Sequence, residues 1–216
     1  MAIKMSDYIN PNGFSILVNF PTKLKLANFQ TNAQSGYVLD CIFKTKITVM
    51  DYLKEKGDFS EHKIEQALQL VKLKPSLYSV AMSSLTKVET KKVELALALL
   101  WQARVIVCEH FFDELLYGEQ EYFKRFFRNL LYKKNIKIIL IESNMNFVCE
   151  TVKGFYLFTK NGKSKYIDDF FDDEIYKYVD MPFTVELIKY FESCGHKVDH
   201  DVTFNEALKA IYRGVK

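Results

Sequence analysis

Glycine is scarce in this chain, with eight glycines among 216 residues. Loops that cradle phosphate groups depend on glycine, because their backbone N–H groups must approach the anion closely. Cysteine is also sparse, and the four cysteines are scattered without any C-x-x-C pair. We therefore interpret the cysteines as reduced thiols in a cytosolic protein.

Long apolar runs and a strong charge imbalance are also absent. No apolar run approaches the roughly 20 residues that a membrane-spanning helix needs, and Lys4, Asp7 and Asn10 interrupt any signal-peptide pattern. The net charge is +3 with both signs interspersed, which is too weak to indicate a nucleic-acid or membrane surface. We expect a cytoplasmic protein without a transmembrane segment, attached at most to the inner face of a membrane through a partner.

The remaining composition is that of an ordinary globular protein, 49% hydrophobic and 26% charged. Strand-like and helical segments alternate along the chain. We predict strands at 13–18, 104–108, 136–141, 154–159 and 164–167, and a strand or an extended segment at 37–43. We predict helices at 60–73, 86–100, 119–133, 182–194 and 203–212. Helices between strands imply parallel pairing, and Asn161-Gly162 predicts a hairpin between the last two strands.

The helix that begins near residue 86 carries the clearest local signals. Thr86 is a favourable N-cap, and Glu89 three residues later completes a capping box. From Val93 to Leu100 the helix is apolar almost all round, which predicts deep burial. The continuous apolar run at 104–108 that follows is typical of a strand covered on both faces.

This succession of helix, strand, helix, strand and hairpin resembles the second half of an ABC-transporter nucleotide-binding domain, most clearly from Leu85 to Lys165. The resemblance implies an α/β, P-loop NTPase-like fold with a mostly parallel sheet flanked by helices. The segment between Lys25 and Gly36 is short, so the antiparallel N-terminal region of that family is expected to be trimmed.

The family's LSGGQ signature has a degenerate counterpart. In the matching frame, Lys87 and Val88 stand where the family has two glycines, and Thr86 keeps a hydroxyl where it has serine. Those glycines let the helix N-terminus approach a γ-phosphate held by the opposite subunit. Side chains at both positions are expected to obstruct that approach.

The Walker B and switch positions are altered too. The resemblance places Glu109 where the family's aspartate supports Mg²⁺, and His110 where a glutamate polarises the attacking water. Ser143 takes the place of the switch histidine, and Asp40 that of the Q-loop glutamine.

The phosphate-binding loop is the most altered motif, since nothing in the chain reads GxxxxGK[ST]. Lys25 falls on the position of the P-loop lysine. Asn19 and Leu24 replace the glycines, and Leu26 replaces the hydroxyl that binds Mg²⁺. We interpret Lys25, Thr86 and Glu109 as vestigial nucleotide contacts.

The tail has a proline at the start of one helix (Pro182), a Gly195-His196 turn and a Thr203 cap before the next helix. This pattern resembles the C-terminal extension of energy-coupling-factor type ATPase subunits, which helps two such subunits pair. We therefore predict an ABC ATPase-like domain at 1–175 and a helical extension at 176–216 that serves dimerisation.

Two groups have ligand-like spacing, one at Glu109, His110, Asp113 and Glu114 and one at Cys194, His196 and His200. Neither has a complete set of ligands, and we expect no metal. The acidic run at 168–174 is interpreted as a solvated loop or a partner-facing patch.

Three functions follow from these positions. The first is a non-enzymatic pseudo-ATPase without cofactor, which acts as a regulatory, adaptor or assembly subunit, on a membrane transporter for example. It would pair as a homodimer, or as a heterodimer with another ATPase-like subunit. The second is a divergent transporter subunit that still binds ATP and Mg²⁺. The third is a DNA-associated ABC-like protein, against which the modest charge argues.

Overall fold

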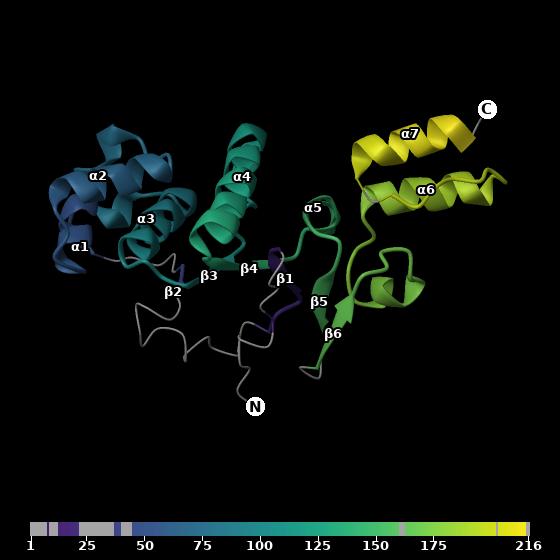
Figure 1. Ribbon diagram of the computed structural model, residues 1–216, viewed down its shortest axis with the longest axis horizontal. Coiled ribbons are helices and arrows are strands. Elements are labelled where there is room, and N and C mark those ends of the chain that lie inside the picture. The colour runs from purple at the N-terminus through teal and green to yellow at the C-terminus, as the bar shows by residue number, and fades with distance from the viewer. Residues whose placement is uncertain are drawn as a thin grey trace. The chain divides into compact units, whose positions relative to one another are not determined.

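A computed structural model describes residues 8, 13–21, 37–39, 45–159, 163–201 and 203–214. Contacts within the chain define two compact units (Figure 1). Unit 1 comprises Met1–Leu24 and Leu140–Lys216, and unit 2 comprises Lys25–Ile139. The predicted division at residue 175 stays a prediction. The segment between Lys25 and Gly36, where trimming was expected, lies outside the described residues.

Within the part of the chain that the structure describes, six strands form a sheet in the order β2-β3-β4-β1-β5-β6. β1 pairs with β5 and β2 pairs with β3 in parallel, whereas β5 and β6 are antiparallel. The predicted mostly parallel α/β sheet and the pairing of the last two strands are therefore confirmed, and the turn between those strands lies outside the described residues. The bounds are Ser15–Val18 (β1), Tyr37–Val38 (β2), Val105–Glu109 (β3), Lys137–Glu142 (β4), Phe155–Phe158 (β5) and Ser164–Ile167 (β6).

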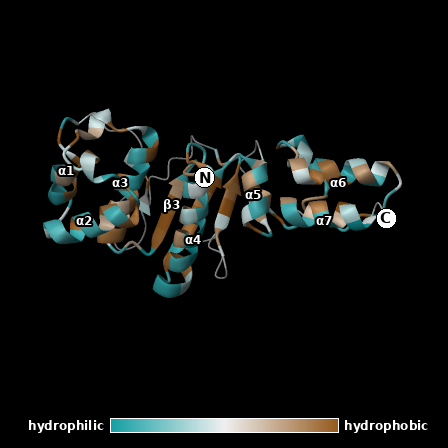
Figure 2. Cartoon of the chain, turned by 90° about the horizontal axis from the view of Figure 1, so that it is seen from above, coloured by the Kyte–Doolittle hydropathy of each residue, from teal (hydrophilic) through white to brown (hydrophobic). Residues whose placement is uncertain are grey.

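Unit 2 is built around α3 (Lys87–Leu100) and β3. The side chains from Val93 to Ala98 are buried, as the apolar run predicted, and Ile106, Val107 and Cys108 of β3 are completely buried. Figure 2 shows β3 in the hydrophobic colour along its length. Helix α2 (Glu61–Leu70) packs against α3, and two 3-10 turns at Pro75–Leu77 and Met82–Ser84 connect these helices.

Helix α4 (Tyr117–Lys134) follows β3 and contributes an aromatic cluster to the core of unit 2. The ring of Phe111, just after β3, lies 4.9 Å from that of Phe123 and 5.4 Å from that of Phe127, both on α4. The helix begins two residues before the predicted start, because the Leu116 carbonyl already accepts from the amides of Glu119 and Gln120.

Two seven-residue helices carry no clear sequence periodicity and were not predicted. Helix α1 (Val49–Glu55) is capped by Thr48, whose hydroxyl accepts from the Asp51 amide at 3.1 Å. Helix α5 (Met145–Thr151) is capped by Asn144. In both, one side-chain cap satisfies amides that a short helix would otherwise leave without partners.

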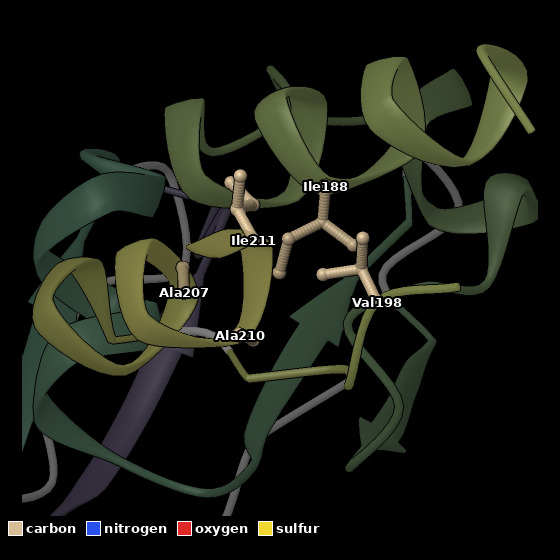
Figure 3. Close-up of a cluster of buried hydrophobic side chains, with 5 residues drawn as sticks. All are labelled: Ile188, Val198, Ala207, Ala210 and Ile211. Carbon is tan, nitrogen blue, oxygen red and sulfur yellow. The ribbon is translucent and has the colours of Figure 1, made fainter. Parts of the chain in front are cut away.

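The predicted tail helices are present in unit 1 as α6 (Phe183–Ser193) and α7 (Phe204–Gly214). They pack around a small core that includes Ile188 and Ile211 (Figure 3). The acidic run ends in a 3-10 helix, Asp173–Lys177, rather than continuing as a loop, because the Asp172 carboxylate caps it by accepting from the Glu174 amide at 2.9 Å. Among the described residues, no helix is long and apolar enough to cross a membrane.

Candidate functional site

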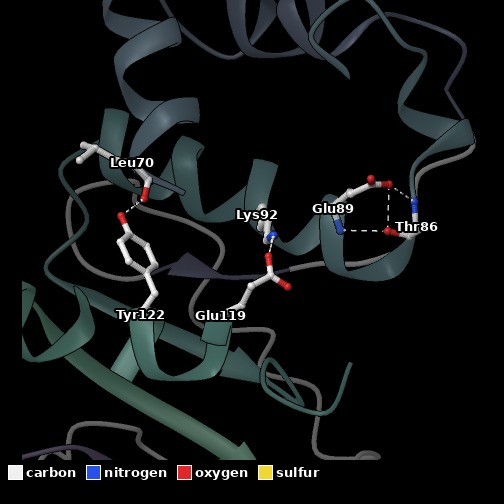
Figure 4. A network of polar contacts seen from close by, with 6 residues as sticks. All are labelled: Leu70, Thr86, Glu89, Lys92, Glu119 and Tyr122. Atoms are coloured by element: carbon white, nitrogen blue, oxygen red, sulfur yellow. Dashed lines mark hydrogen bonds and ion pairs between the residues drawn. The ribbon is translucent and has the colours of Figure 1, made fainter. Parts of the chain in front are cut away.

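The first turn of α3 contains the predicted capping box in full (Figure 4). The Thr86 hydroxyl accepts from the Glu89 amide at 3.2 Å, and the Thr86 amide donates to Glu89 Oε2 at 2.9 Å. The Thr86 hydroxyl also donates to the same carboxylate oxygen at 2.9 Å. The carboxylate of Glu89 thus lies against the N-terminal end of the helix, where the helix dipole attracts negative charge.

The two positions after Thr86 form the start of α3 itself. Lys87 is exposed and Val88 is half-buried, so both carry side chains on the first turn. An external phosphate approaching this helix end would meet these side chains and the Glu89 carboxylate. The Glu89 carboxylate therefore already lies at this end of α3.

The end of β3 is held by contacts within unit 2. Glu109 and His110 are both half-buried, and His110 has a left-handed backbone with φ of 48°. Its carbonyl accepts from the Lys91 ammonium, and its ring Nδ1 lies 3.1 Å from Asp113 Oδ2. His110, the residue predicted to stand at the position of the family's general base, is thereby held by a lysine of α3 and lies beside a neighbouring carboxylate.

Helix α3 carries three charged side chains whose burial was not predicted from the sequence. Lys91 and Lys92 are each 6% exposed and Glu94 is 1% exposed. Lys92 Nζ lies 2.6 Å from Glu119 Oε1, a contact drawn in Figure 4. The hydrogen bond from Lys92 lowers the pKa of Glu119, which keeps the pair charged. No spacing rule would have revealed this pair, because its members lie on different helices.

The carboxylate of Glu94 accepts hydrogen bonds from two tyrosines. Tyr52 of α1 donates to Glu94 Oε1 at 2.7 Å, and the Tyr37 hydroxyl of β2 donates to Glu94 Oε2. A buried carboxylate needs such donors to offset the loss of hydration. Glu94 therefore links β2 and α1 to the central helix of unit 2 and serves its architecture.

Two of the positions predicted for the P-loop and the switch, Asn19 and Ser143, are described by the structure and lie in unit 1. Asn19, predicted to stand where the family has its first P-loop glycine, has a left-handed φ of 55°, and its side-chain amide donates to the Tyr178 carbonyl at 2.8 Å. Ser143 is exposed, and the following Asn144 caps α5 by accepting from the amides of Asn146 and Phe147. Asn19 thus keeps the backbone conformation that glycine favours, while its side chain binds another segment.

Lys25 and Asp40 lie outside the described residues, so the structure does not place these two predicted positions. Of the predicted positions that are described, Thr86 and His110 lie on segments that one contact connects. The Lys91 ammonium, on the helix that begins after Thr86, donates to the His110 carbonyl just after β3. The cysteine–histidine group of the tail has other contacts. The His200 ring stacks on Phe171 with centroids 3.9 Å apart, and its Nε2 lies 2.9 Å from Glu192 Oε1.

No protein-family model and no curated protein matches the sequence. The fold is nevertheless similar to solved ATP-binding cassettes. The dimeric post-hydrolysis state of the cassette MJ0796 bound to ADP and Pi is 12% identical, with a TM-score of 0.57, and the match covers 73% of this chain and 86% of that one.

A second dimeric structure of MJ0796, described as a bacterial ABC transporter cassette, is 11% identical with a TM-score of 0.56, and the match covers 69% of this chain and 82% of that chain. An inward-facing structure described as a metal-chelate type ABC transporter is 16% identical with a TM-score of 0.57, covering 73% and 72%. At these identities the likeness establishes the fold alone. This chain therefore has the α/β fold of ABC ATPase cassettes.

Proposed function

We propose that this protein is a pseudo-ATPase, a catalytically inactive ABC ATPase-like protein that acts as a regulatory, adaptor or assembly subunit of a membrane complex. Its partner would be a second copy of the chain or another ATPase-like subunit, as in the energy-coupling-factor transporters that the tail resembles. The cassette fold supports this proposal, because such cassettes can associate, as the dimeric MJ0796 structures illustrate.

The observation that carries the proposal is the capping box at the start of α3. In the ABC family this helix end faces a γ-phosphate across the subunit interface. Here the Glu89 carboxylate accepts from both the amide and the hydroxyl of Thr86, and would repel a phosphate. A phosphate that approached this end of α3 would therefore meet a carboxylate that is already held there.

The contact of Asn19 with Tyr178 supports the same conclusion in unit 1. In the family, the corresponding loop presents bare amides to the phosphates. In this chain a side chain occupies that position, and its amide is bonded to the Tyr178 carbonyl. Both halves of a composite nucleotide site are therefore changed, so pairing with a competent ATPase would leave neither interface site intact.

A row of apolar side chains on α7 supports the proposed protein contacts. Phe204, Leu208 and Tyr212, here called the α7 stripe, are 43%, 43% and 74% exposed. Their spacing of four residues places them on one side of the helix, while Ala207 and Ile211 face α6. Exposed apolar patches on soluble domains commonly mark interaction sites. The stripe is therefore the surface that we assign to the partner subunit.

The proposal is tested with the purified full-length protein. We expect no Mg²⁺-dependent phosphate release above that of a heat-denatured sample, and no heat of ATP binding by titration calorimetry at micromolar concentrations. Micromolar ATP affinity together with hydrolysis would overturn the proposal. ATP binding that Lys25→Ala abolishes would instead favour the divergent transporter subunit.

A further inference from the structure

A cavity of about 810 Å³ lies in unit 2, where α3 and α4 end. It is lined by the last residues of these helices, by the residues that follow them, and by Leu70 of α2. The 14-residue helix α3 is roughly 20 Å long, so the cavity lies far from the capping box at its other end. The cavity is therefore distinct from the positions that resemble a nucleotide site.

The inner wall of this cavity is apolar. Ala103 is completely buried and Leu130 is 7% exposed, while Leu99 and Phe126 are half-buried. The volume falls within the approximately 300–1,000 Å³ range of small-molecule pockets, which are mostly apolar with a few polar groups at fixed positions. This wall suits the hydrocarbon part of a ligand.

The charged residues on the rim all have one sign. Arg104, Lys133 and Lys134 are exposed, and no carboxylate is among the described residues that line the cavity. Three cations near an apolar wall attract an anion that brings its own apolar body. The rim therefore selects for negative charge and the wall for hydrocarbon.

Backbone geometry adds two amide side chains to the same cavity. Gln102 and Asn135 follow the ends of α3 and α4 with left-handed φ values of 54° and 53°, and both line the cavity. Glycine is the usual residue at such helix ends. At the end of α3 the Ala98 carbonyl accepts from the Ala103 amide at 3.0 Å, and at the end of α4 the Leu130 carbonyl accepts from the Ile136 amide at 3.1 Å. Because these two carbonyls are already hydrogen-bonded, they repel an anion in the cavity less. The chain thus keeps polar side chains at two positions where glycine would be less strained.

We propose that this cavity binds a free single-chain amphiphile with a carboxylate head, of which a fatty acid is the simplest example. The head lies at the rim between Arg104 and the two lysines, with the amides of Gln102 and Asn135 as hydrogen-bond donors. The chain lies against Phe126 and Leu130. The single apolar wall suits one hydrocarbon tail, and the single basic rim suits one carboxylate head. The proposed binding does not depend on whether the protein binds ATP.

The test uses the full chain and two probes of equal tail length and opposite charge, dodecanoate and dodecyltrimethylammonium, below their micelle concentrations. Trp101 is the only tryptophan and directly precedes Gln102, so its fluorescence reports on this region. We expect saturable binding of dodecanoate and at least roughly tenfold weaker binding of the cation, a difference of about 1.4 kcal/mol. Equal affinity for both probes, or no saturation with dodecanoate, would overturn the proposal.

Two variants locate the site. The double variant Lys133→Glu/Lys134→Glu should weaken dodecanoate binding at least about tenfold, whereas Arg125→Glu should leave it unchanged. Arg125 is exposed on the same helix and does not line the cavity, so it controls for charge reversal alone. Circular dichroism checks that both variants fold. Equal effects of the two changes would contradict the proposal. A further test measures whether the protein binds anionic phospholipid vesicles and whether dodecanoate displaces it. Vesicle binding that dodecanoate does not displace would contradict the proposal, because the basic rim would then bind a membrane surface and not a free amphiphile.

Discussion

At the scale of single residues, the most unusual groups are the charged side chains buried along α3. Lysine can lie in such a place because its apolar stem packs against other side chains while its ammonium reaches a partner. Lys91 reaches the carbonyl of His110, and Lys92 reaches the carboxylate of Glu119. These lysines therefore connect α3 to the segments that follow β3.

Replacing Glu119 should expose how much the Lys92 ammonium depends on its partner. The Lys92 side chain is 7% exposed and that of Glu119 is 32% exposed, so Glu119→Gln leaves a nearly buried cation without a counter-charge. We expect a loss of about 1–2 kcal/mol in the free energy of unfolding, measured by urea denaturation. Glu61→Gln breaks the exposed pair with Lys54 and should cost less than about 0.5 kcal/mol.

The same pair should make stability depend on pH in the acidic range. The pKa of Glu119 is lowered in the folded state from its ordinary value of 4.5, chiefly by the hydrogen bond from Lys92. Its stabilisation is therefore complete above that value and is lost as the pH falls through the lower, folded-state pKa. The difference in unfolding free energy between wild type and Glu119→Gln should shrink on acidification. A constant difference from neutral pH to pH 3 would contradict this explanation.

Some contacts of these residues could be predicted from the sequence and others could not, and the difference has a physical reason. Thr86 and Glu89 are three positions apart, so their capping box is a local pattern that the sequence displays in full. Lys92 and Glu119 meet only because α3 and α4 pack together, and Asn19 meets Tyr178 only in the folded chain. Contacts of this kind depend on tertiary structure and leave no local signature.

At the scale of the element, α3 depends on its N-cap. Thr86→Ala removes both the acceptor for the Glu89 amide and the hydroxyl contact with its carboxylate, and should lower the unfolding free energy by about 1 kcal/mol. Lys87→Ala, at the adjacent exposed position, is the matched control and should have little effect. Guanidinium denaturation measures both. A Thr86→Ala protein as stable as wild type would show that α3 does not need this cap.

Element prediction succeeded where the apolar pattern was long and failed where it was short. The buried strand at 104–108 and the helix beginning after Thr86 were recognised by continuous apolar runs, and the structure contains them as β3 and α3. Helices α1 and α5 have seven residues each and are defined by caps at Thr48 and Asn144 more than by periodicity. Such short helices hold little amphipathic information, so packing decides whether they form.

At the scale of the whole molecule, the fold is similar to that of ATP-binding cassettes although the sequences are only 11–16% identical. The predicted fold class was correct because alternating helices and buried strands admit few arrangements. The role of the fold in this chain is a separate matter, since one fold can host many functions. The candidate site was predictable only by matching positions to the family's motifs, and all of these assignments stay predictions.

The α7 stripe provides a test of association that does not involve nucleotide. Leu208→Lys places a charge in the middle of the stripe without touching the buried residues Ala207 and Ile211. We expect it to abolish self-association, or association with a co-expressed ATPase-like subunit, in sedimentation velocity runs. Asn205→Lys adds the same charge to an exposed position off the stripe and should leave association intact. Equal behaviour of the two variants would remove the stripe from consideration as the interface.

Strand β6 has a further consequence, for the behaviour of the protein at high concentration. Among the described strands it is the outermost, next to β5, and its first three residues, Ser164, Lys165 and Tyr166, are exposed. An open edge strand offers unpaired backbone groups to other chains and can start aggregation, but short strands and lysine discourage such pairing. With four residues and a lysine among them, β6 is a poor template for intermolecular strand addition, so we expect little aggregation through this edge at high concentration.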